Sequence, residues 1–137
     1  MIDEGERWPR LPITADDDLD TASILKKNKK YAHACFHAQQ AGEKAIKAVW
    51  YFLDADPWGH SIKKLIVDLA RNDKKIYNSL KSLEKTGMIL DRFYIPTRYP
   101  NGLPDITPDM AFAEEDATTC IDFAQLILDK VKDITGL

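Results

Sequence analysis

The chain has 137 residues, of which 30% are charged and 45% hydrophobic, as is ordinary for one soluble globular domain over residues 1–137. It has no run of about 20 apolar residues and no apolar signal region at its acidic N-terminus, so we expect a cytoplasmic protein rather than a membrane or secreted one. The net charge of −3 is uneven, with 11 basic and 5 acidic side chains in residues 26–75 between two acidic segments. The basic segment permits an anionic ligand, although charge complementarity between neighbouring helices is the simpler explanation.

The first expected element is an irregular arm over residues 1–13, because Pro9 and Pro12 oppose a regular helix. Thr14 is a good N-cap residue, and three aspartates follow it where negative charge suits a helix N-terminus. The sequence therefore predicts a first helix over 15–27.

The segment 29–53 has a strong helical pattern. On a helical wheel its apolar residues form a wide arc, which is typical of a central bundle helix. We expect this helix to be the most buried one, with four small residues inside: Ala38, Ala41, Ala45 and Val49. The opposite arc is a polar, mostly basic stripe that includes Gln40, Lys44 and Lys47.

Two further helices are expected over 61–70 and 74–94. Gly87 weakens the second one by about 1 kcal/mol relative to alanine and permits a local kink, and Pro96 ends it. A turn-rich loop then runs to about 107, and a last helix begins there or near 113 and ends at 134. Since no strand pattern stands out, the sequence predicts an all-α fold of about five helices.

Metal or thiol chemistry has little support in the sequence. His33 and His37 are spaced i, i+4, but no third ligand is evident, so we expect two polar-face histidines and no metal or other cofactor. Cys35 falls in the apolar arc and is expected to be a small core residue, and Cys35 and Cys120 fit reduced thiols. The glycine-rich phosphate loops and the nucleophile elbow of known enzyme classes are absent.

Two features could bind an anion. The stripe of Gln40, Lys44 and Lys47 is either a solvated face or a groove for phosphate. Arg98 lies between two prolines and near Tyr94 and Tyr99, so it could clamp a phosphate while a tyrosine stacks on a base. Alternatively, Arg98 neutralises helix carbonyls or an aspartate and fixes the loop.

The same segments carry a family resemblance. Residues 31–48 look like the second helix of the HEPN domain, named for higher eukaryotes and prokaryotes, and His60 is similar to that family's start of the next helix. The segments 91–94 and 97–100 resemble its motif after the fourth helix. The match covers about residues 8–134.

The resemblance implies an antiparallel up-and-down four-helix-type bundle that is usually dimeric. It also implies a protein often encoded beside a minimal nucleotidyltransferase, with roles in toxin–antitoxin or nucleotide-related systems. Many family members are metal-independent RNases that use an arginine followed four to six residues later by a histidine. This sequence lacks that spacing, because no arginine stands at that distance before any of its three histidines.

Three hypotheses of function follow. In the first, the chain is a nucleotide-binding or partner-binding module that acts with a nucleotidyltransferase and has no catalytic residue. Lys44, Lys47, His60 and Arg98 then contact the anion, Tyr94 or Tyr99 stacks on the base, and Gln40 bonds the sugar or base. In the second, it is an RNase toxin with His37 or His60 as the base and Arg98 as the cation. In the third, it is a structural partner that binds a nucleotidyltransferase through the polar stripe. We also expect a homodimer.

Overall fold

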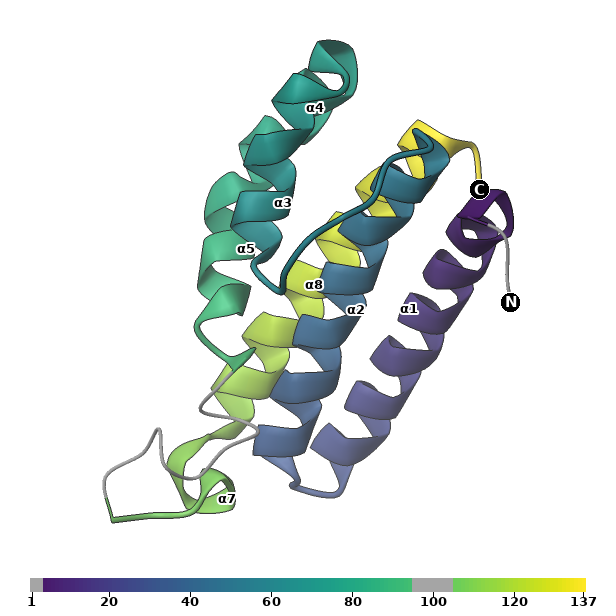
Figure 1. Ribbon diagram of the computed structural model, residues 1–137. Helices are drawn as coiled ribbons and strands as arrows, with labels where there is room; N and C mark the ends of the chain where they lie inside the picture. The colour runs from purple at the N-terminus through teal and green to yellow at the C-terminus, as the bar shows by residue number, and fades with distance from the viewer. Residues whose placement is uncertain (1–3, 95–104) are drawn as a thin grey trace.

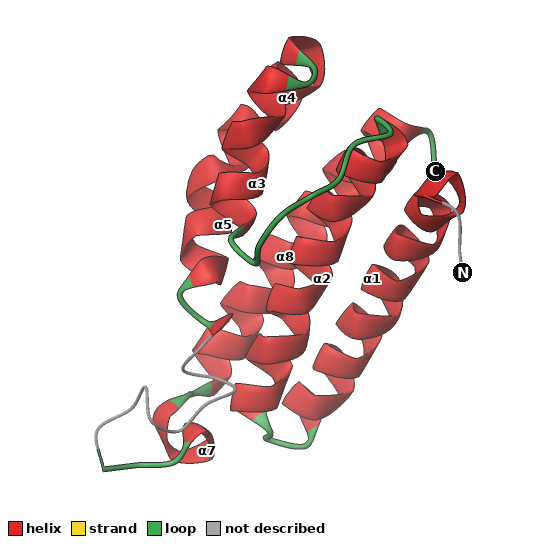
Figure 2. Cartoon of the chain, viewed as in Figure 1, coloured by secondary structure: helices red, strands yellow, loops and turns green. Residues whose placement is uncertain are grey.

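The computed structural model describes residues 4–94 and 105–137, and all regular structure in these ranges is helical (Figures 1 and 2). The elements in chain order are α1 (Glu4–Lys27), α2 (Tyr31–Phe52), α3 (Ile62–Asp68), the 3₁₀ turn η1 (Leu69–Arg71), α4 (Lys74–Leu80), the 3₁₀ turn η2 (Lys81–Leu83), α5 (Glu84–Asp91), α7 (Pro108–Ala111) and α8 (Glu114–Thr135). This arrangement confirms the expected all-α helical bundle.

Helix α2 is the centre of the bundle. Figure 1 shows α1 antiparallel to α2, and α3 and α5 antiparallel to each other on the other side. Cys35 of α2 lies against Cys120 of α8, and Gly42 lies near Ile127, so residue numbers rise together and these two helices run parallel. A chain that returns to the same direction in this way needs a long connection, which residues 53–61 and the α3–α5 hairpin provide.

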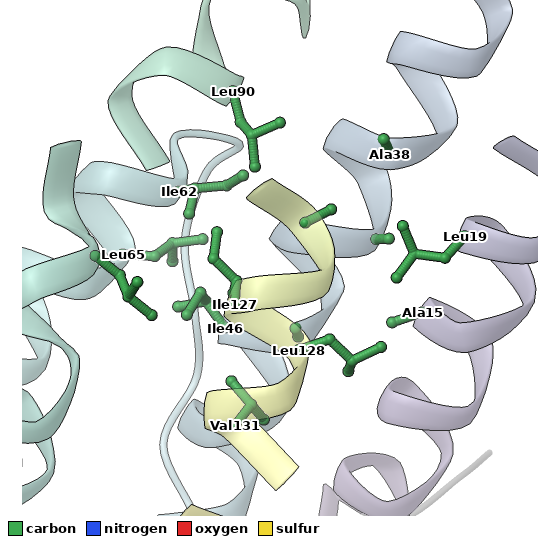
Figure 3. Packing of buried hydrophobic residues seen from close by; sticks show 14 of the residues in the cluster. Ala15, Leu19, Ala38, Ile46, Ile62, Leu65, Leu90, Ile127, Leu128 and Val131 are labelled. Atoms are coloured by element: carbon green, nitrogen blue, oxygen red, sulfur yellow. The ribbon is translucent and has the colours of Figure 1, made fainter. Parts of the chain in front are cut away.

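The core confirms the expected burial of α2. Its small residues Ala38, Ala41, Ala45 and Val49 are all 0% exposed. Alanines at these positions let the backbones of α1 and α8 approach closely, and larger side chains fill the remaining space. Figure 3 shows these larger residues converging from α1, α2, α3, α5 and α8. They include Leu19, Ile46, Ile62, Leu65, Leu90, Ile127, Leu128 and Val131.

The irregular arm expected over residues 1–13 is wrong for the described part, residues 4–13. Helix α1 begins at Glu4 and continues through Pro9 and Pro12. A proline inside a helix costs about 3 kcal/mol, but Pro12 is buried and Leu11 packs against the core, so tertiary packing outweighs the local preference. Thr14 therefore lies inside the helix, where its hydroxyl donates a hydrogen bond to the Arg10 carbonyl (3.0 Å) and caps nothing.

The segment expected as one helix over 74–94 is interrupted, but not at Gly87. It breaks at η2, and α5 ends at Asp91. Gly87 is buried inside α5, where the position of a Cβ atom would be 2.8 Å from Cγ2 of Ile62 and 3.2 Å from the Lys63 backbone nitrogen. The glycine therefore lets α3 and α5 approach each other, which a pattern read along one helix does not reveal.

Replacing Gly87 with alanine should destabilise the protein, although alanine is the better helix former. The new methyl group needs α3 to move, and overpacking of this kind costs about 1–3 kcal/mol against a propensity gain of about 1 kcal/mol. Urea denaturation followed by circular dichroism measures the change. Lys85→Ala, on an exposed part of the same helix, is the control and should be nearly neutral. A more stable Gly87→Ala variant would contradict the close approach.

The remaining helices agree with those predicted from the sequence. The segment 61–70 forms α3 and η1. The two starting points considered for the last helix are both used, since α7 begins at Pro108 and α8 begins at Glu114. The carboxylate of Asp116 accepts a hydrogen bond from the Ala113 backbone N–H (2.8 Å), which caps the start of α8. Pro96 lies outside the described residues.

Candidate functional site

The candidate site forms around two polar side chains that are buried on α2. Gln39 is 0% exposed and Glu43 is 4% exposed. Gln40 Nε2 donates to Gln39 Oε1 (2.7 Å), and Gln39 Nε2 donates to Glu43 Oε1 (3.4 Å). Since a buried carboxylate is costly unless it is paired, these contacts indicate that Glu43 is held in a defined position.

The second oxygen of Glu43 contacts two cationic or titratable groups. Lys47 Nζ lies 3.0 Å from Glu43 Oε2, and His60 Nδ1 lies 3.2 Å from the same oxygen. Lys47 balances the charge of Glu43, so the site is close to neutral when His60 is neutral. A ligand would therefore be recognised by stacking and directional hydrogen bonds more than by net charge.

The contact with Glu43 also determines how His60 presents its ring. An ionised carboxylate is only an acceptor, so Nδ1 of His60 donates the hydrogen bond and carries the proton. In the neutral ring, Nε2 then remains as an acceptor. The His60 side chain is 60% exposed, so this acceptor is available to a ligand.

Tyr94 stacks on one face of the His60 ring, whose edge carries the hydrogen bond to Glu43. The two rings are stacked with centroids 5.0 Å apart and an interplanar angle of 16°. His60 comes from the connection before α3, and Tyr94 follows α5, so residues from two distant segments form one flat aromatic pair next to Glu43. Such a pair offers a stacking surface at the edge of the bundle.

Asp91, at the end of α5, brings these two segments together. Its carboxylate accepts hydrogen bonds from the Ser61 hydroxyl (2.8 Å) and from the backbone N–H groups of Ile62 (2.6 Å) and Lys63 (3.2 Å). The two N–H groups are among the backbone donors left unpaired at the start of α3, so Asp91 caps α3 from another helix. The cap fixes the segment before α3 beside the segment after α5.

Metal and thiol chemistry find no support at this site. Among residues 4–94 and 105–137, no cluster of three or more histidine, cysteine or acidic side chains could hold a metal ion. Cys35 and Cys120 are free and buried, which confirms Cys35 as a core residue. The hydrogen bond that the Cys120 thiol donates to Cys35, together with burial, raises the pKa of Cys120, so it is not a thiolate nucleophile at neutral pH.

The described helices include none that is both long and apolar enough to cross a membrane.

A family model described as HEPN domain matches residues 11–134. The chain belongs to the HEPN family. Similar solved structures are TT1696 from Thermus thermophilus (32% identity, TM-score 0.82, covering 93% of this chain and 97% of that one) and ST0689, an archaeal HEPN homologue (31%, 0.74, 98% and 99%). A HEPN domain protein from Thermotoga maritima is also similar (26%, 0.71, 93% and 98%).

A relative named as a candidate toxin, MJ1304 of Methanocaldococcus jannaschii, is 27% identical over 128 residues, which is 87% of this chain and 82% of that protein. The word toxin in this name describes the relative.

In this HEPN domain the predicted polar stripe of α2 divides between two neighbours. Gln40 and Lys47 join the network around Glu43. Lys44 instead forms an ion pair with Asp18 of α1 (2.7 Å), and His37 Nδ1 lies 3.8 Å from the same carboxylate. Lys44 therefore connects α2 to α1 and does not join His60. Arg98 and Tyr99 lie outside the described residues.

Sequence reasoning missed Gln39 and Glu43 as members of the candidate site. Both were absent from the candidate residues, although both are more buried than any residue of the predicted stripe. One signal was available: at 100° per residue, both lie within about 20° of Trp50 on the wheel. A glutamine and a glutamate beside a tryptophan on one helix indicate a buried polar pair.

Proposed function

We propose that this HEPN domain binds a nucleotide or a single-stranded RNA base at the His60–Tyr94 pair. The observation that supports the proposal is the stacked pair itself. Glu43 holds His60 through a hydrogen bond, and Asp91 holds the segment that follows His60. Flat aromatic faces with an adjacent acceptor suit a nucleobase, which needs a stacking surface and a hydrogen-bond partner. Gln40 lies on the same network and supplies an amide group. Lys47 is already paired with Glu43, so in this proposal it balances the charge beside His60.

Arg98 and Tyr99 remain part of this proposal. We propose that Arg98 clamps the phosphate, with Tyr99 as a second stacking residue. Arg98→Lys should then weaken ligand binding, because lysine cannot make the planar two-point contact. Lys44 is left out of the proposed contacts, since Asp18 already pairs with it.

The binding proposal is tested by fluorescence anisotropy with labelled adenosine nucleotides and a short single-stranded RNA. Tyr94→Ala should weaken binding by about 1–3 kcal/mol, or roughly 5- to 150-fold in Kd, which is the usual value of one stacked base. Trp58→Ala is the matched control, because Trp58 is an exposed aromatic residue of the same connection that does not contact His60 in any described interaction. Equal losses in both variants would contradict a specific site.

A second function is favoured by the contact between Glu43 and His60. A histidine whose Nδ1 is held by a carboxylate can accept a proton at Nε2, as RNA cleavage by attack of the 2′-hydroxyl requires. The similarity to a relative named as a candidate toxin is consistent with such an activity. Incubation of single-stranded RNA with the protein in EDTA tests it: His60→Ala should lower the rate by about 10²- to 10⁴-fold. Intact RNA after long incubation with the wild-type protein would exclude cleavage and leave the binding proposal standing.

Partners also remain proposals. We propose a homodimer and a nucleotidyltransferase partner, as the family resemblance implies. The wide apolar arc of α2 gives no support to the dimer, because α1, α3 and α8 already cover it within one chain. Light scattering of the purified protein decides the first point, and a mass of one chain would contradict the dimer.

A further inference from the structure

A concave surface lies where α1 joins α2. Figure 1 shows this junction at the lower end of the view. The surface is a hollow of about 480 Å³, which is within the usual size of a small-ligand pocket. Seven residues from three helices and one turn line it: Ser23, Lys26, Lys27, Lys29, Tyr31, Glu114 and Ile121. We call it the lysine hollow.

The lysine hollow is separate from the site at His60. Tyr31 and Glu43 are both on α2, but they are twelve residues apart, or about 18 Å along the helix axis and about a third of a turn around it. The hollow faces α1 and the first turns of α8, whereas Glu43 faces the connection before α3. A ligand in one place would therefore leave the other free.

The charge of the hollow is positive and unbalanced. Lys26, Lys27 and Lys29 line it together with one carboxylate, Glu114. None of these three lysines forms an ion pair with any residue in the ranges 4–94 and 105–137, whereas Lys44, Lys47, Lys64 and Lys132 all do. Lys26 and Lys27 also suit the negative end of the α1 dipole, so their presence alone has a structural explanation.

Lys29 has no such explanation. Its backbone is in the left-handed region, with φ of 62°. The Lys29 N–H donates to the Lys26 carbonyl (3.0 Å) and the Lys30 N–H donates to the Leu25 carbonyl (2.8 Å), which is the hydrogen-bond pattern that ends a helix on a left-handed residue. Glycine is strongly favoured at this position, because any Cβ atom is unfavourable there. A lysine at a position that favours glycine points to a requirement for its charge.

Next to the three lysines, the hollow offers a flat apolar surface. Tyr31 is half-buried and its hydroxyl makes no hydrogen bond to the described residues, and Ile121 of α8 also lines the hollow. We propose that the lysine hollow binds a phosphate-bearing ligand with a flat ring, with its phosphates on Lys26, Lys27 and Lys29 and its ring on Tyr31. Free nucleoside triphosphates and the strand of a nucleic acid both have this chemistry.

The test is calorimetric titration with ATP, inorganic triphosphate and a short RNA that carries a 5′-hydroxyl. Tighter binding of ATP than of RNA assigns the ligand as a free nucleotide, and the reverse assigns it as a nucleic acid strand. Inorganic triphosphate lacks the ring and should bind more weakly than ATP. Absence of binding by all three probes at about 5 mM would overturn the proposal.

The decisive variant is Lys29→Gly. It should raise the melting temperature, because glycine is the favoured residue at φ of 62°, and weaken ligand binding about tenfold by removing a charged contact. A residue with a merely structural role would not shift the two quantities in opposite directions. Lys26→Gln should weaken binding by a similar factor, whereas Lys130→Gln, at an exposed position near the far end of α8, is the matched control and should leave it unchanged.

Chemical-shift mapping separates this inference from the proposed function. Ligand bound in the lysine hollow should shift the amide signals of Ser23, Lys26, Lys29 and Tyr31, and these shifts should persist in Tyr94→Ala. Ligand bound at His60 should instead shift signals near His60 and Tyr94, and these should persist in Lys29→Gly. Binding that is unaffected by Lys29→Gly and Lys26→Gln would overturn the lysine hollow as a ligand site while leaving the His60 site untouched.

Discussion

Replacing Glu43 with alanine will lower the free energy of unfolding by about 2–4 kcal/mol, because the carboxylate is the shared partner of several groups that stay in place. Gln39 is 0% exposed and would lose the acceptor of its amide N–H, and Lys47 would keep its charge at a mostly buried position without a partner. Urea denaturation measures this loss.

Glu43→Gln is the informative companion of that variant. Glutamine keeps the volume and one oxygen acceptor but removes the charge, so the loss should be smaller than with alanine. The same variant should weaken the orientation of His60, since a neutral amide is a poorer acceptor than a carboxylate. An unchanged free energy of unfolding in Glu43→Ala would show that the network contributes no stability.

Replacing Ile127 with alanine should cost about 2–5 kcal/mol, the usual range for removing a large buried aliphatic side chain. Ile127 is 0% exposed and its Cδ1 atom would lie 3.7 Å from a Cβ atom at Gly42, so it fills the contact between α8 and α2 (Figure 3). The cavity left by Ile127 cannot close easily, because α2, on its other side, is held in place by its close-packed small residues.

The neighbouring residue provides the control for this variant. Leu126 is on the same helix but is 51% exposed, so Leu126→Ala removes a similar side chain without opening a cavity. Its cost should stay below about 1 kcal/mol. Equal losses at the two positions, measured by urea denaturation, would contradict the register of α8 against α2.

The fold could be predicted from the sequence where the pattern within one helix determines which of its sides is buried. The arc of α2 defined its buried side, and Ala38, Ala41 and Val49 lie inside as expected. The N-terminal segment failed for the opposite reason. Pro9 and Pro12 give a strong local signal against a helix, but the energy that overrides it comes from packing on helices that are distant in sequence.

The site was harder to predict, because a helical wheel gives the direction of each side chain but not the residues of other helices that it contacts. Lys44 and Lys47 lie on the same polar stripe, yet one pairs with Asp18 of α1 and the other with Glu43. The proximity of His60 and Tyr94 depends on Asp91, whose role as a cap for α3 joins residues about 30 positions apart. No pattern within either segment contains that contact. Arg98 and Tyr99 remain predictions.

The cap that Asp91 places on α3 has a consequence for motion. Because one carboxylate holds the Ser61 hydroxyl and the N–H groups of Ile62 and Lys63, we expect fraying of the last turn of α5 to loosen the start of α3 in the same event. Hydrogen–deuterium exchange of the Ile62 and Lys63 amides therefore reports how often that joint opens. We expect each opening to separate His60 from Tyr94 as well, so that the aromatic pair forms and breaks together with the Asp91 cap.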